Sequence, residues 1–452
     1  MNLLWFVLDG VYVVRFFNSG RPVMEAWILA QPAGLNSTAR ISLHSRLRLM
    51  MKILKNLTRL RYLIKDAPYH SLGQLYRYMQ LYLNSGFHKS HLKKKSLAEI
   101  RRDKLIRRLS EGIPASSNKI GVPSARKGNI PLRVAFTINA LKGIAGSEIW
   151  LSQMSEELHQ RNIDCMIYTP NPGPQAERIK RRGIHVTSNA AEVIGFNPGL
   201  IHLQHASNAK IQQLINRLDN QKPIFNLIHG VAPTLELPYI NDSRVISYGA
   251  VSRLVAAKVA FLTGLSPGNI NLLKNFFTQR TIPCNKVDVP RRAAIVSSKV
   301  SPRQFESYKA MFEELSVKLD VYGNKLSNEI GDYSVIANDY DFFLCTGKTA
   351  IDILGFGKPV ILLEENLLGP AVVDENIRFL SNMNFALASP LVEAVELGSE
   401  NILPALKREI ARLQSTDAVK TNNYLLENNS IDVIANQLTG IYSTMVETLQ
   451  VG

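Results

Sequence analysis

Residues 132–170 read LRVAFTINALKGIAGSEIWLSQMSEELHQRNIDCMIYTP, and the pattern of this stretch decides the fold. Its first part, LRVAFTI, is an apolar run that contains the residue types favoured in strands. The segment IWLSQMSEELHQRN then places apolar residues at helical spacing, and DCMIYTP is a second strand-like run. A strand, a loop, a helix and another strand in succession predict a parallel β-sheet covered by helices.

The loop that precedes this helix carries two glycines, Gly143 and Gly146. Glycine lets the backbone approach a ligand closely, and the free N–H groups of a helix start attract anions. Ser147 stands where we expect the N-cap of the helix, and Glu148 suits the positive end of the helix dipole. Two interpretations of the loop remain open, namely a tight turn with a helix cap or a ligand-binding loop.

The same alternation of strands and helices continues and predicts two α/β lobes, at 131–288 and 289–452. Further strands are expected in IHVTS, GLIHLQHA, PIFNLIHG and RVISYGA, and then in RRAAIVSS, KLDVYGN, DYDFFLC and KPVILLE. We therefore expect two Rossmann-like doubly wound lobes with a ligand at the carboxyl ends of their strands. The final stretch, SIDVIANQLTGIYSTMVETL, has an amphipathic helical pattern that can pack on either lobe.

A phosphate site is predicted at the start of LCTGKTAIDILGFGKPVILLEE, residues 344–365. Its GKT matches the end of a Walker A loop, but that loop requires a glycine where this chain has Phe342, so an ATP-binding P-loop is excluded. Instead, a strand stops before Gly347, and a helix begins near Thr349, which can cap it. Gly347 allows a phosphate to approach, and Lys348 offers a cation at the mouth of the helix. The alternative is an ordinary strand–helix turn with a surface lysine.

Three further residues stand on a helix or at the end of a strand, at positions where we expect side chains to face a ligand. Asp352, one turn into the same helix, can bind a sugar hydroxyl, or it is a solvated carboxylate. Glu365 lies in the loop after the next strand. His229 ends the apolar strand IFNLIHG and can contact a sugar or transfer a proton. His202 and His205 also lie at a strand end, where a lone histidine is more often structural.

Positive charge is concentrated near the N-terminus. Residues 1–130 contain 23 of the 53 Lys and Arg but 6 of the 37 Asp and Glu, which leaves a net charge of −1 for 131–452. We predict a basic, mainly helical region at 1–111 and a linker at 112–130, and residues 42–65 have an apolar face interleaved with Lys and Arg. Such a helix can bind an anionic membrane surface, form a solvated face or, less plausibly, contact nucleic acid. No nucleic-acid-binding signature is present, so we expect no nucleic-acid partner.

The first 17 residues, MNLLWFVLDGVYVVRFF, form an apolar run that Asp9 and Gly10 interrupt. The run is shorter than the about 20 residues of a spanning helix, and it lacks the basic start and cleavage site of a signal peptide. A buried strand or helix, an interfacial segment and a wrongly assigned start codon are all compatible with it. No other stretch reaches membrane-spanning length, so we expect a cytoplasmic protein that is peripheral to the inner face of the membrane.

The three cysteines, Cys165, Cys284 and Cys345, are far apart in the sequence. Their number and spacing fit neither a disulfide framework nor a metal site, and they suit a reducing compartment. We therefore expect no structural metal.

Together these motifs resemble the GT-B glycosyltransferases, in particular glycosyltransferase family 4. That family opens its first lobe with a strand, a Gly-Gly-x-Glu turn and a helix, and residues 132–170 follow this layout with Ala145 in place of the first glycine. IHG at 228–230 is similar to the family's His-Gly, and residues 251–277 resemble its stretch before the lobe hinge. In the second lobe, TAIDILGFGKPVILLEENLLG is similar to the family's acidic helix followed by Gly-x-Pro-Val, with Asp352 where glutamate is usual.

The resemblance implies that a sugar is transferred from a nucleotide-sugar donor to a carbohydrate or lipid-linked acceptor. GT-B enzymes need no metal or cofactor, because a helix dipole and basic side chains neutralise the leaving diphosphate. The catalytic candidates are then His229 and Asp352. The donor-binding candidates are Gly347, Lys348, Thr349, Lys299 and Glu365, and the candidates of the loop on the acceptor side are Gly143, Gly146, Ser147 and Glu148.

The sequence departs from the family at two points. The family's paired glutamates stand eight residues apart, but Leu344 occupies the position eight before Asp352. The family holds the donor pyrophosphate with an Arg and a Lys early in the second lobe, and the nearest counterpart in this chain is Lys299. The missing acid keeps open an alternative, namely a GT-B-like protein that has lost catalysis and serves as a binding partner or scaffold.

Overall fold

The computed structural model describes the backbone of residues 2–8, 11–18 and 21–29, and it describes residues 132–451 except 144, 232–233, 241, 285–286, 324–327, 329, 331 and 388–391. The N-terminal strands β1 (Asn2–Leu8), β2 (Val11–Asn18) and β3 (Arg21–Leu29) form an antiparallel sheet. They belong to one compact unit, Met1–Tyr62, whereas both lobes belong to the other, Leu63–Gly452.

The prediction that residues 1–111 are mainly helical is wrong for β1–β3. Their sequences, NLLWFVL, VYVVRFFN and RPVMEAWIL, are rich in the aromatic and β-branched residues that favour strands. Asp-Gly and Ser-Gly pairs stand between them in the sequence, and such pairs favour hairpins. The helix predicted at 42–65 and the linker predicted at 112–130 lie outside the described residues.

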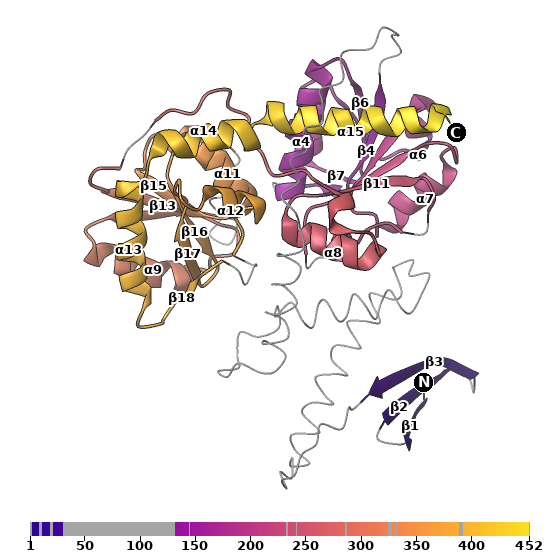
Figure 1. Cartoon of the computed structure of the whole chain (residues 1–452), viewed down its shortest axis with the longest axis horizontal. Coiled ribbons are helices and arrows are strands. Elements are labelled where there is room, and N and C mark those ends of the chain that lie inside the picture. Colours follow the sequence, from indigo (N-terminus) through magenta and orange to yellow (C-terminus); the bar gives the residue numbers. More distant parts are fainter. Residues whose placement is uncertain are drawn as a thin grey trace. The chain divides into compact units, whose positions relative to one another are not determined.

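The first lobe is built on a seven-stranded parallel sheet (Figure 1). Across the sheet the strands are β12 (Ile270–Leu272), β11 (Val245–Ala250), β10 (Ile224–Ile228), β9 (Leu200–Leu203), β4 (Arg133–Thr137), β6 (Asp164–Tyr168) and β8 (His185–Thr187). Its helices are α4 (Gly146–Gln160), α5 (Pro174–Lys180), α6 (Ala190–Phe196), α7 (Ala209–Arg217) and α8 (Arg253–Thr263). Short elements complete it, namely β5 (Ala140–Leu141), β7 (Asn171–Pro172), η1 (Thr234–Glu236) and η2 (Pro267–Asn269). The strand order reverses between β4 and β9, which makes this point the topological switch point.

The second lobe has a six-stranded sheet that is parallel at its centre and antiparallel at one edge. Its strands are, in order across the sheet, β14 (Lys318–Tyr322), β13 (Arg292–Val296), β15 (Phe342–Cys345), β16 (Val360–Glu364), β17 (Leu367–Ala371) and β18 (Val395–Glu396). Its helices are α9 (Pro302–Glu314), α10 (Ser334–Ala337), α11 (Gly347–Gly355), α12 (Ile377–Asn382), α13 (Ile402–Ser415) and α14 (Ala418–Asn429). The strand order of this sheet reverses between β13 and β15. The predicted fold class, two Rossmann-like doubly wound lobes, is therefore confirmed.

The central strands are apolar because both faces of each sheet are covered. All five residues of β10, IFNLI, are buried, and so are all four residues of β15, FFLC. Near-continuous apolar runs of this kind are typical of parallel strands between two helical layers.

Two chain segments cross between the lobes and pair with one another. The Phe277 N–H donates to the Asn429 carbonyl at 3.1 Å, and the Ile431 N–H donates to the Phe277 carbonyl at 3.0 Å. Phe276 belongs to the core of the first lobe and Phe277 to a core cluster of the second, so the lobe boundary falls between two adjacent residues.

The C-terminal helix α15 (Ile431–Val451) packs on the first lobe and not on the lobe that precedes it (Figure 1). Its residues in the core of the first lobe are Ile431, Ile434, Ala435, Leu438, Ile441, Tyr442 and Met445. The predicted domain limit at 288/289 thus needs one correction, because α15 was grouped with the second lobe. The amphipathic pattern did not distinguish between the two lobes.

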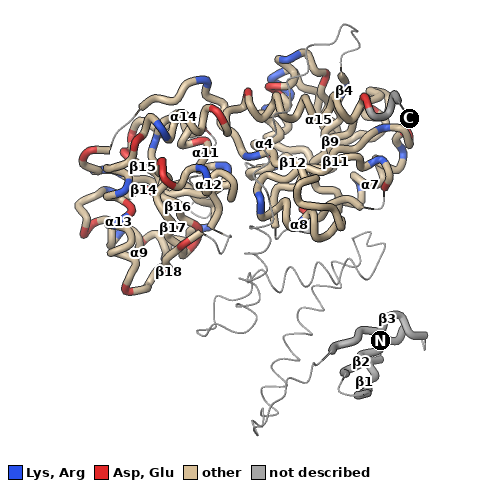
Figure 2. Tube along the Cα trace, in the orientation of Figure 1, with Lys and Arg blue, Asp and Glu red and all other residues tan. Residues whose placement is uncertain are grey.

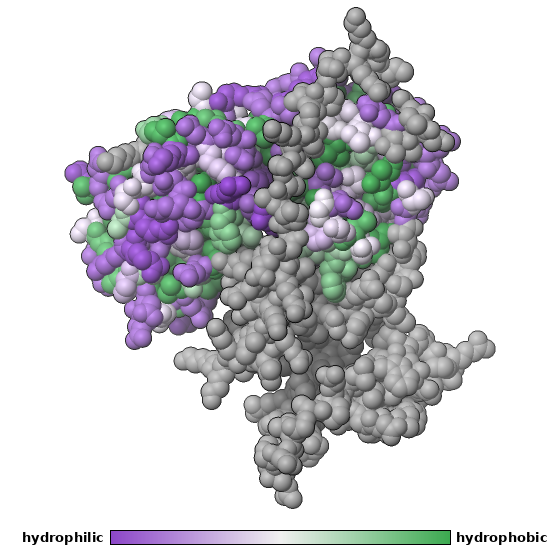
Figure 3. All heavy atoms as spheres, in the orientation of Figure 1, coloured by the Kyte–Doolittle hydropathy of each residue, from purple (hydrophilic) through white to green (hydrophobic). Residues whose placement is uncertain are grey.

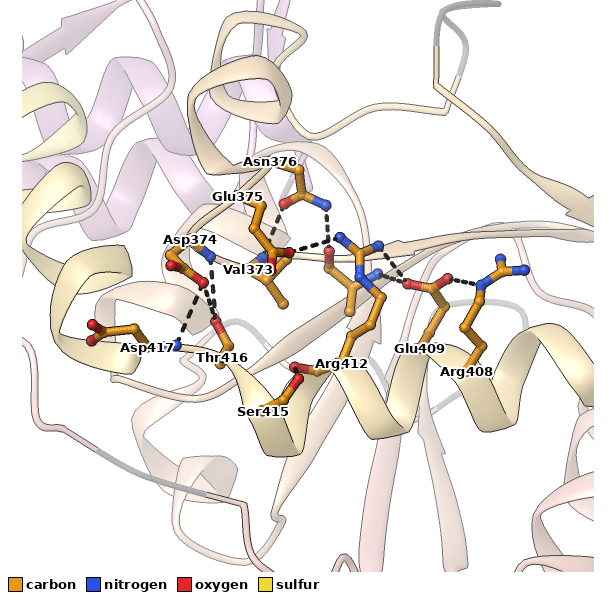
Figure 4. A network of polar contacts seen from close by, with 11 residues as sticks. Val373, Asp374, Glu375, Asn376, Arg408, Glu409, Arg412, Ser415, Thr416 and Asp417 are labelled. Carbon is orange, nitrogen blue, oxygen red and sulfur yellow. Dashed lines mark hydrogen bonds and ion pairs between the residues drawn. The ribbon is translucent and has the colours of Figure 1, made fainter.

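A network of polar contacts holds α13 against the antiparallel edge of the second sheet (Figure 4). The Glu409 carboxylate is buried and accepts hydrogen bonds from the Ala371 N–H at 2.9 Å and from Arg412 at 3.0 Å. Arg408 contacts the same carboxylate at 2.8 Å, and Arg412 also reaches Glu375 at 3.4 Å. Because these partners satisfy the buried charge, we interpret this network as structural.

Charges of both signs are interspersed over both lobes, in line with the near-zero net charge of 131–452 (Figure 2). Hydrophilic and hydrophobic residues are likewise mixed on the face that Figure 3 shows. Among the described helices, none is both long and apolar enough to cross a membrane.

The close packing of α11 on the crossing segment leads to a prediction for Gly355. A Cβ atom at this position would lie 2.6 Å from Phe277 Cβ and 2.5 Å from Gln279 Oε1. We expect Gly355→Ala to destabilise the protein by about 1–3 kcal/mol in urea unfolding, because the added methyl has no room. Gly195→Ala is the control, because a Cβ on this α6 glycine meets nothing within 4 Å and should be neutral or stabilising. Equal effects of the two substitutions would contradict the proposed packing.

Candidate functional site

The switch point of the first sheet is closed by contacts between the ends of β4 and β9. Thr137 Oγ1 donates to the Gln204 carbonyl at 3.0 Å, and the Gln204 N–H returns a bond to the same hydroxyl at 3.1 Å. The Asn139 N–H then donates to His205 Nδ1 at 3.1 Å. His205 has a φ of +54°, a left-handed conformation that costs about 1 kcal/mol or more for a residue with a side chain. Such strain clusters at functional sites.

Glu236 is the centre of a buried polar network beside this switch point. Its Oε1 lies 3.2 Å from His205 Nε2, and its Oε2 accepts the His229 N–H at 2.7 Å. Lys258 closes the network, because its Nζ donates to the Gly230 carbonyl at 2.9 Å and to the Glu236 carbonyl at 2.6 Å. One carboxylate therefore fixes both the ring of His205 and the backbone of His229.

The charges of this network follow from its burial. Burial acts to raise the pKa of Glu236, but the hydrogen bond from His205 and the charges of His229 and His205 outweigh it and lower the pKa to about 2. Burial lowers the pKa of His229 to about 4, against the opposing charge of Glu236. Burial likewise lowers the pKa of Lys258 to about 8. At neutral pH the Glu236 carboxylate is thus ionised and the His229 imidazole is neutral.

The three histidines at strand ends have different surroundings. His202 is fully buried and lies 2.5 Å from the Tyr442 hydroxyl on α15, which makes it a core residue. Both ring nitrogens of His205 are occupied by the contacts given above. His229 packs edge-on against Trp150, with ring centroids 5.4 Å apart, and its Nε2 has no partner among the described residues. His229 is therefore the histidine of this group with a buried ring nitrogen that no described residue satisfies.

The glycine loop of the first lobe is closed by Glu148. The carboxylate of Glu148 accepts the Gly143 N–H at 3.0 Å. The helix α4 begins at Gly146, with Ala145 as its N-cap and no side-chain cap hydrogen bond. Ser147 is therefore not the N-cap, as the sequence pattern had suggested, but lies within the first turn.

The second lobe presents the N-terminus of α11 at its own switch point. This helix begins at Gly347, which has a φ of +62°, and its N-cap is Thr346 without a side-chain hydrogen bond. The Gly347 N–H donates to the Phe385 carbonyl at 2.9 Å. Thr349 is not the cap that we expected, because it is the third residue of the first turn and its hydroxyl is 3.3 Å from the Tyr333 hydroxyl. The amides of residues 348 and 349 have no backbone acceptor among the described residues.

Lys348 differs from the expected surface cation. It is only 5% exposed, and its Nζ contacts the Asp352 carboxylate and donates to the Phe276 carbonyl at 2.9 Å. The ammonium also lies 5.2 Å from the centroid of the Phe276 ring. Burial lowers the pKa of Lys348 and raises that of Asp352, and each shift is opposed by the charge of the other residue. In this structure Lys348 therefore neutralises Asp352 and does not present a free charge at the helix mouth.

The two helix starts, one from each lobe, lie next to one another. A Cβ atom on Gly146 would lie 3.6 Å from Lys348 Cβ, which is ordinary van der Waals contact. The first turn of α4 therefore touches the first turn of α11, and the positive ends of two helix dipoles lie close together.

The two remaining donor-side candidates, Lys299 and Glu365, follow two different strands of the second sheet. Lys299 follows β13 at the second switch point, and its ammonium contacts the Glu364 carboxylate. Glu365 has a φ of +52° in the tight connection between the antiparallel strands β16 and β17, and its side chain is exposed. Glu365 thus lies in the loop after β16, as expected, and residues 367–371 return as β17.

Sequence reasoning missed Glu236 and Lys258. Glu236 lies 31 positions from His205 in the sequence, and no local pattern joins the two residues. Lys258 stands among apolar residues in VAAKVAFL. A single lysine inside an apolar helical segment is the one signal that could have indicated a buried partner. Among the described residues, no group of three or more His, Cys, Asp or Glu is arranged to hold a metal ion.

Comparisons with known proteins find distant structural likeness only. No protein-family profile and no curated protein sequence matches the chain. A glycosyltransferase from Rickettsia africae ESF-5 is 13% identical, with 70% of this chain and 99% of that chain aligned and a TM-score of 0.49. The calicheamicin glycosyltransferase CalG4 is 13% identical over 70% of this chain and 99% of its own, with a TM-score of 0.40. MnaA from S. aureus, solved with UDP, is 12% identical over 70% of this chain and 97% of its own, with a TM-score of 0.43. Likeness at this level does not bear on activity.

The pairing of Lys348 with Asp352 leads to a stability prediction. Lys348→Met should destabilise the protein by about 3–5 kcal/mol in urea unfolding, because it leaves a buried carboxylate without a partner. The double variant Lys348→Met/Asp352→Leu should regain most of this loss. Lys180→Met is the control, since Lys180 forms an exposed pair with Glu177 and should change stability by less than about 1 kcal/mol. A single variant as stable as the double variant would refute the buried pair.

The low pKa of His229 leads to a pH prediction. The unfolded chain has an ordinary histidine pKa near 6.5, whereas the folded value is about 4, so the unfolded state binds the proton more readily between these values. The wild type should therefore lose about 1–3 kcal/mol of stability as the pH falls from 6.5 to 4. His229→Gln should lose less over the same range, as measured by urea unfolding at each pH, whereas the exposed control His159→Gln should follow the wild type. An unchanged pH profile in His229→Gln would contradict a buried neutral imidazole.

Proposed function

We propose that this protein is a glycosyltransferase that uses a nucleotide-sugar donor. The observation that carries the proposal is the contact between the first turns of α4 and α11. Each of these helices follows a central strand of its sheet, and their glycine-bearing starts meet between two switch points. Parallel α/β sheets bind ligands at such points, and two lobes offer one face to a donor and another to an acceptor.

On the donor side, we assign the diphosphate to the backbone amides of the α11 start. The left-handed Gly347 opens the turn, and the amides of Lys348 and Thr349 point out of the first turn of the helix. Because Asp352 neutralises the Lys348 side chain, we assign the stabilisation to the helix dipole and the amides, not to that ammonium. Lys299 stays a proposed contact to the donor because it follows the end of β13, and Glu365, in the connection between β16 and β17, stays a second proposed donor contact.

On the acceptor side, the loop of Gly143, Gly146, Ser147 and Glu148 and the neutral His229 are the proposed contacts. A neutral imidazole with a free nitrogen can accept a hydrogen bond or a proton from a sugar hydroxyl. Glu236 supports this role by holding the His229 backbone in place.

In the proposed reaction, the bond between the anomeric carbon of the donor sugar and the diphosphate oxygen breaks. A hydroxyl oxygen of the acceptor forms the new bond to that carbon, and its proton passes to a base, for which His229 is the candidate. The departing diphosphate takes the electron pair of the broken bond, and its charge is met by the α11 amides. Asp352, a catalytic candidate by sequence, is instead proposed as a positioning residue, which acts through Lys348 on the first turn of α11.

The acceptor and the place of action are proposals that rest on charge. The excess of Lys and Arg in residues 1–130 suits an anionic membrane surface, so we propose a lipid-linked or polysaccharide acceptor at the cytoplasmic membrane face.

The proposed activity is tested by nucleotide-sugar binding and turnover. We expect at least one of the UDP-, GDP-, ADP- or CDP-sugars to raise the melting temperature, since a ligand at 100 times its Kd adds about 2.7 kcal/mol. The same donor should be hydrolysed slowly, and His229→Gln should lower this rate by about 10²-fold or more while donor affinity is retained. Binding without any hydrolysis would favour the catalytically inactive scaffold, and the absence of binding to every donor would refute the proposal.

A further inference from the structure

A group of three basic side chains lies beside the crossing segments, away from the residues assigned above. Arg253 is the first residue of α8, Lys274 follows β12, and Arg378 lies on α12 of the second lobe. We call these three residues the hinge cations.

Backbone and side-chain contacts bring together the chain segments that carry the hinge cations. The strands β11 and β12 are parallel neighbours, and the Leu273 N–H donates to the Ala250 carbonyl at 2.9 Å, so Lys274 and Arg253 follow adjacent strand ends. Arg378 comes from the other lobe. One turn after it, Ser381 donates to Asn429 Oδ1 at 2.8 Å, and the Asn429 amide donates to the Asn275 carbonyl at 2.8 Å.

Lys274 is held in place by an aromatic side chain instead of a carboxylate. Its Nζ donates to the Tyr424 hydroxyl at 3.2 Å and lies 5.6 Å from the centroid of the Tyr424 ring. Burial, together with the charges of Arg253 and Arg378, lowers the pKa of Lys274 to about 8. No carboxylate is among the groups that shift it.

The two guanidinium groups are also without acidic partners. Among the described residues, neither Arg253 nor Arg378 forms an ion pair, although Arg378 is exposed and Arg253 is half-buried. Like charges that face one another without compensation raise the free energy of the folded state. An anion between them would remove this repulsion, and the N-terminus of the eleven-residue helix α8 would add to the attraction.

We propose that the hinge cations bind a phosphate group. Two guanidinium groups with forked donors and one ammonium match the geometry and charge of phosphate oxygens. The site draws cations from both lobes, so a bound phosphate links α8 to α12. This inference does not depend on the proposed glycosyl transfer, because none of the three residues belongs to the assigned donor or acceptor contacts.

The proposal is tested by calorimetric titration of the full chain with inorganic phosphate at low ionic strength. We expect Arg378→Gln and Lys274→Gln/Arg378→Gln to weaken phosphate binding, with about tenfold or more lost in the double variant. Arg178→Gln/Lys407→Gln removes the same charge from exposed positions elsewhere and should change the affinity by less than about twofold. Because Arg378 is exposed, its substitution tests the site without risk to folding.

A second arm distinguishes a soluble phosphate from a phospholipid headgroup. Wild type and Arg378→Gln are sedimented with vesicles of phosphatidylglycerol and phosphatidylcholine, so that any contribution of residues 1–130 is common to both. Loss of phosphate affinity with unchanged sedimentation assigns the site to a soluble phosphate, and loss of both assigns it to the headgroup. Phosphate affinity that is unchanged in the double variant, or reduced equally in the control, would overturn the proposal. Donor binding is read separately, so failure of one proposal is distinguishable from failure of the other.

Discussion

The pairing of the two crossing segments is the constraint on which the arrangement of both lobes depends. Phe276 and Phe277 are adjacent in the chain but anchor different cores, and the Phe277 backbone is bonded on both sides to the return crossing at Asn429 and Ile431. The neighbouring Phe276 carbonyl is also satisfied, because it accepts a hydrogen bond from Lys348. With its backbone groups satisfied, the crossing can be buried without an energetic penalty for unpaired donors and acceptors.

The two halves of the candidate site use buried charge in opposite ways. In the first lobe, Glu236 is surrounded by donors and keeps His229 in a fixed place while the imidazole stays neutral. In the second lobe, Asp352 and Lys348 neutralise each other, and the amides of the α11 start are the proposed donor contacts. Charge in one lobe thus positions a side chain, and in the other it stabilises a helix start.

Much of the fold was predictable because parallel strands that are buried on both faces have apolar sequences, as in IFNLIHG and DYDFFLC. The glycine loops at Gly146 and Gly347 were also found, since a turn before a helix has a local signature. What could not be predicted depends on contacts between distant segments, such as Glu236 with His205 and α15 with the first lobe. Lys348 and Asp352 stand four residues apart, a spacing at which helical side chains can pair, but the sequence analysis predicted neither this pair nor its burial.

The position of α15 has a consequence for how the chain is made. The first lobe is synthesised before the second, yet part of its core is supplied by residues 431–445. While it emerges from the ribosome, this lobe must wait with an apolar face uncovered until the whole second lobe has been translated. Completion of the earlier lobe is therefore coupled to translation of the later one, and a ribosome that stalls within the second lobe leaves a first lobe that chaperones can recognise as unfinished.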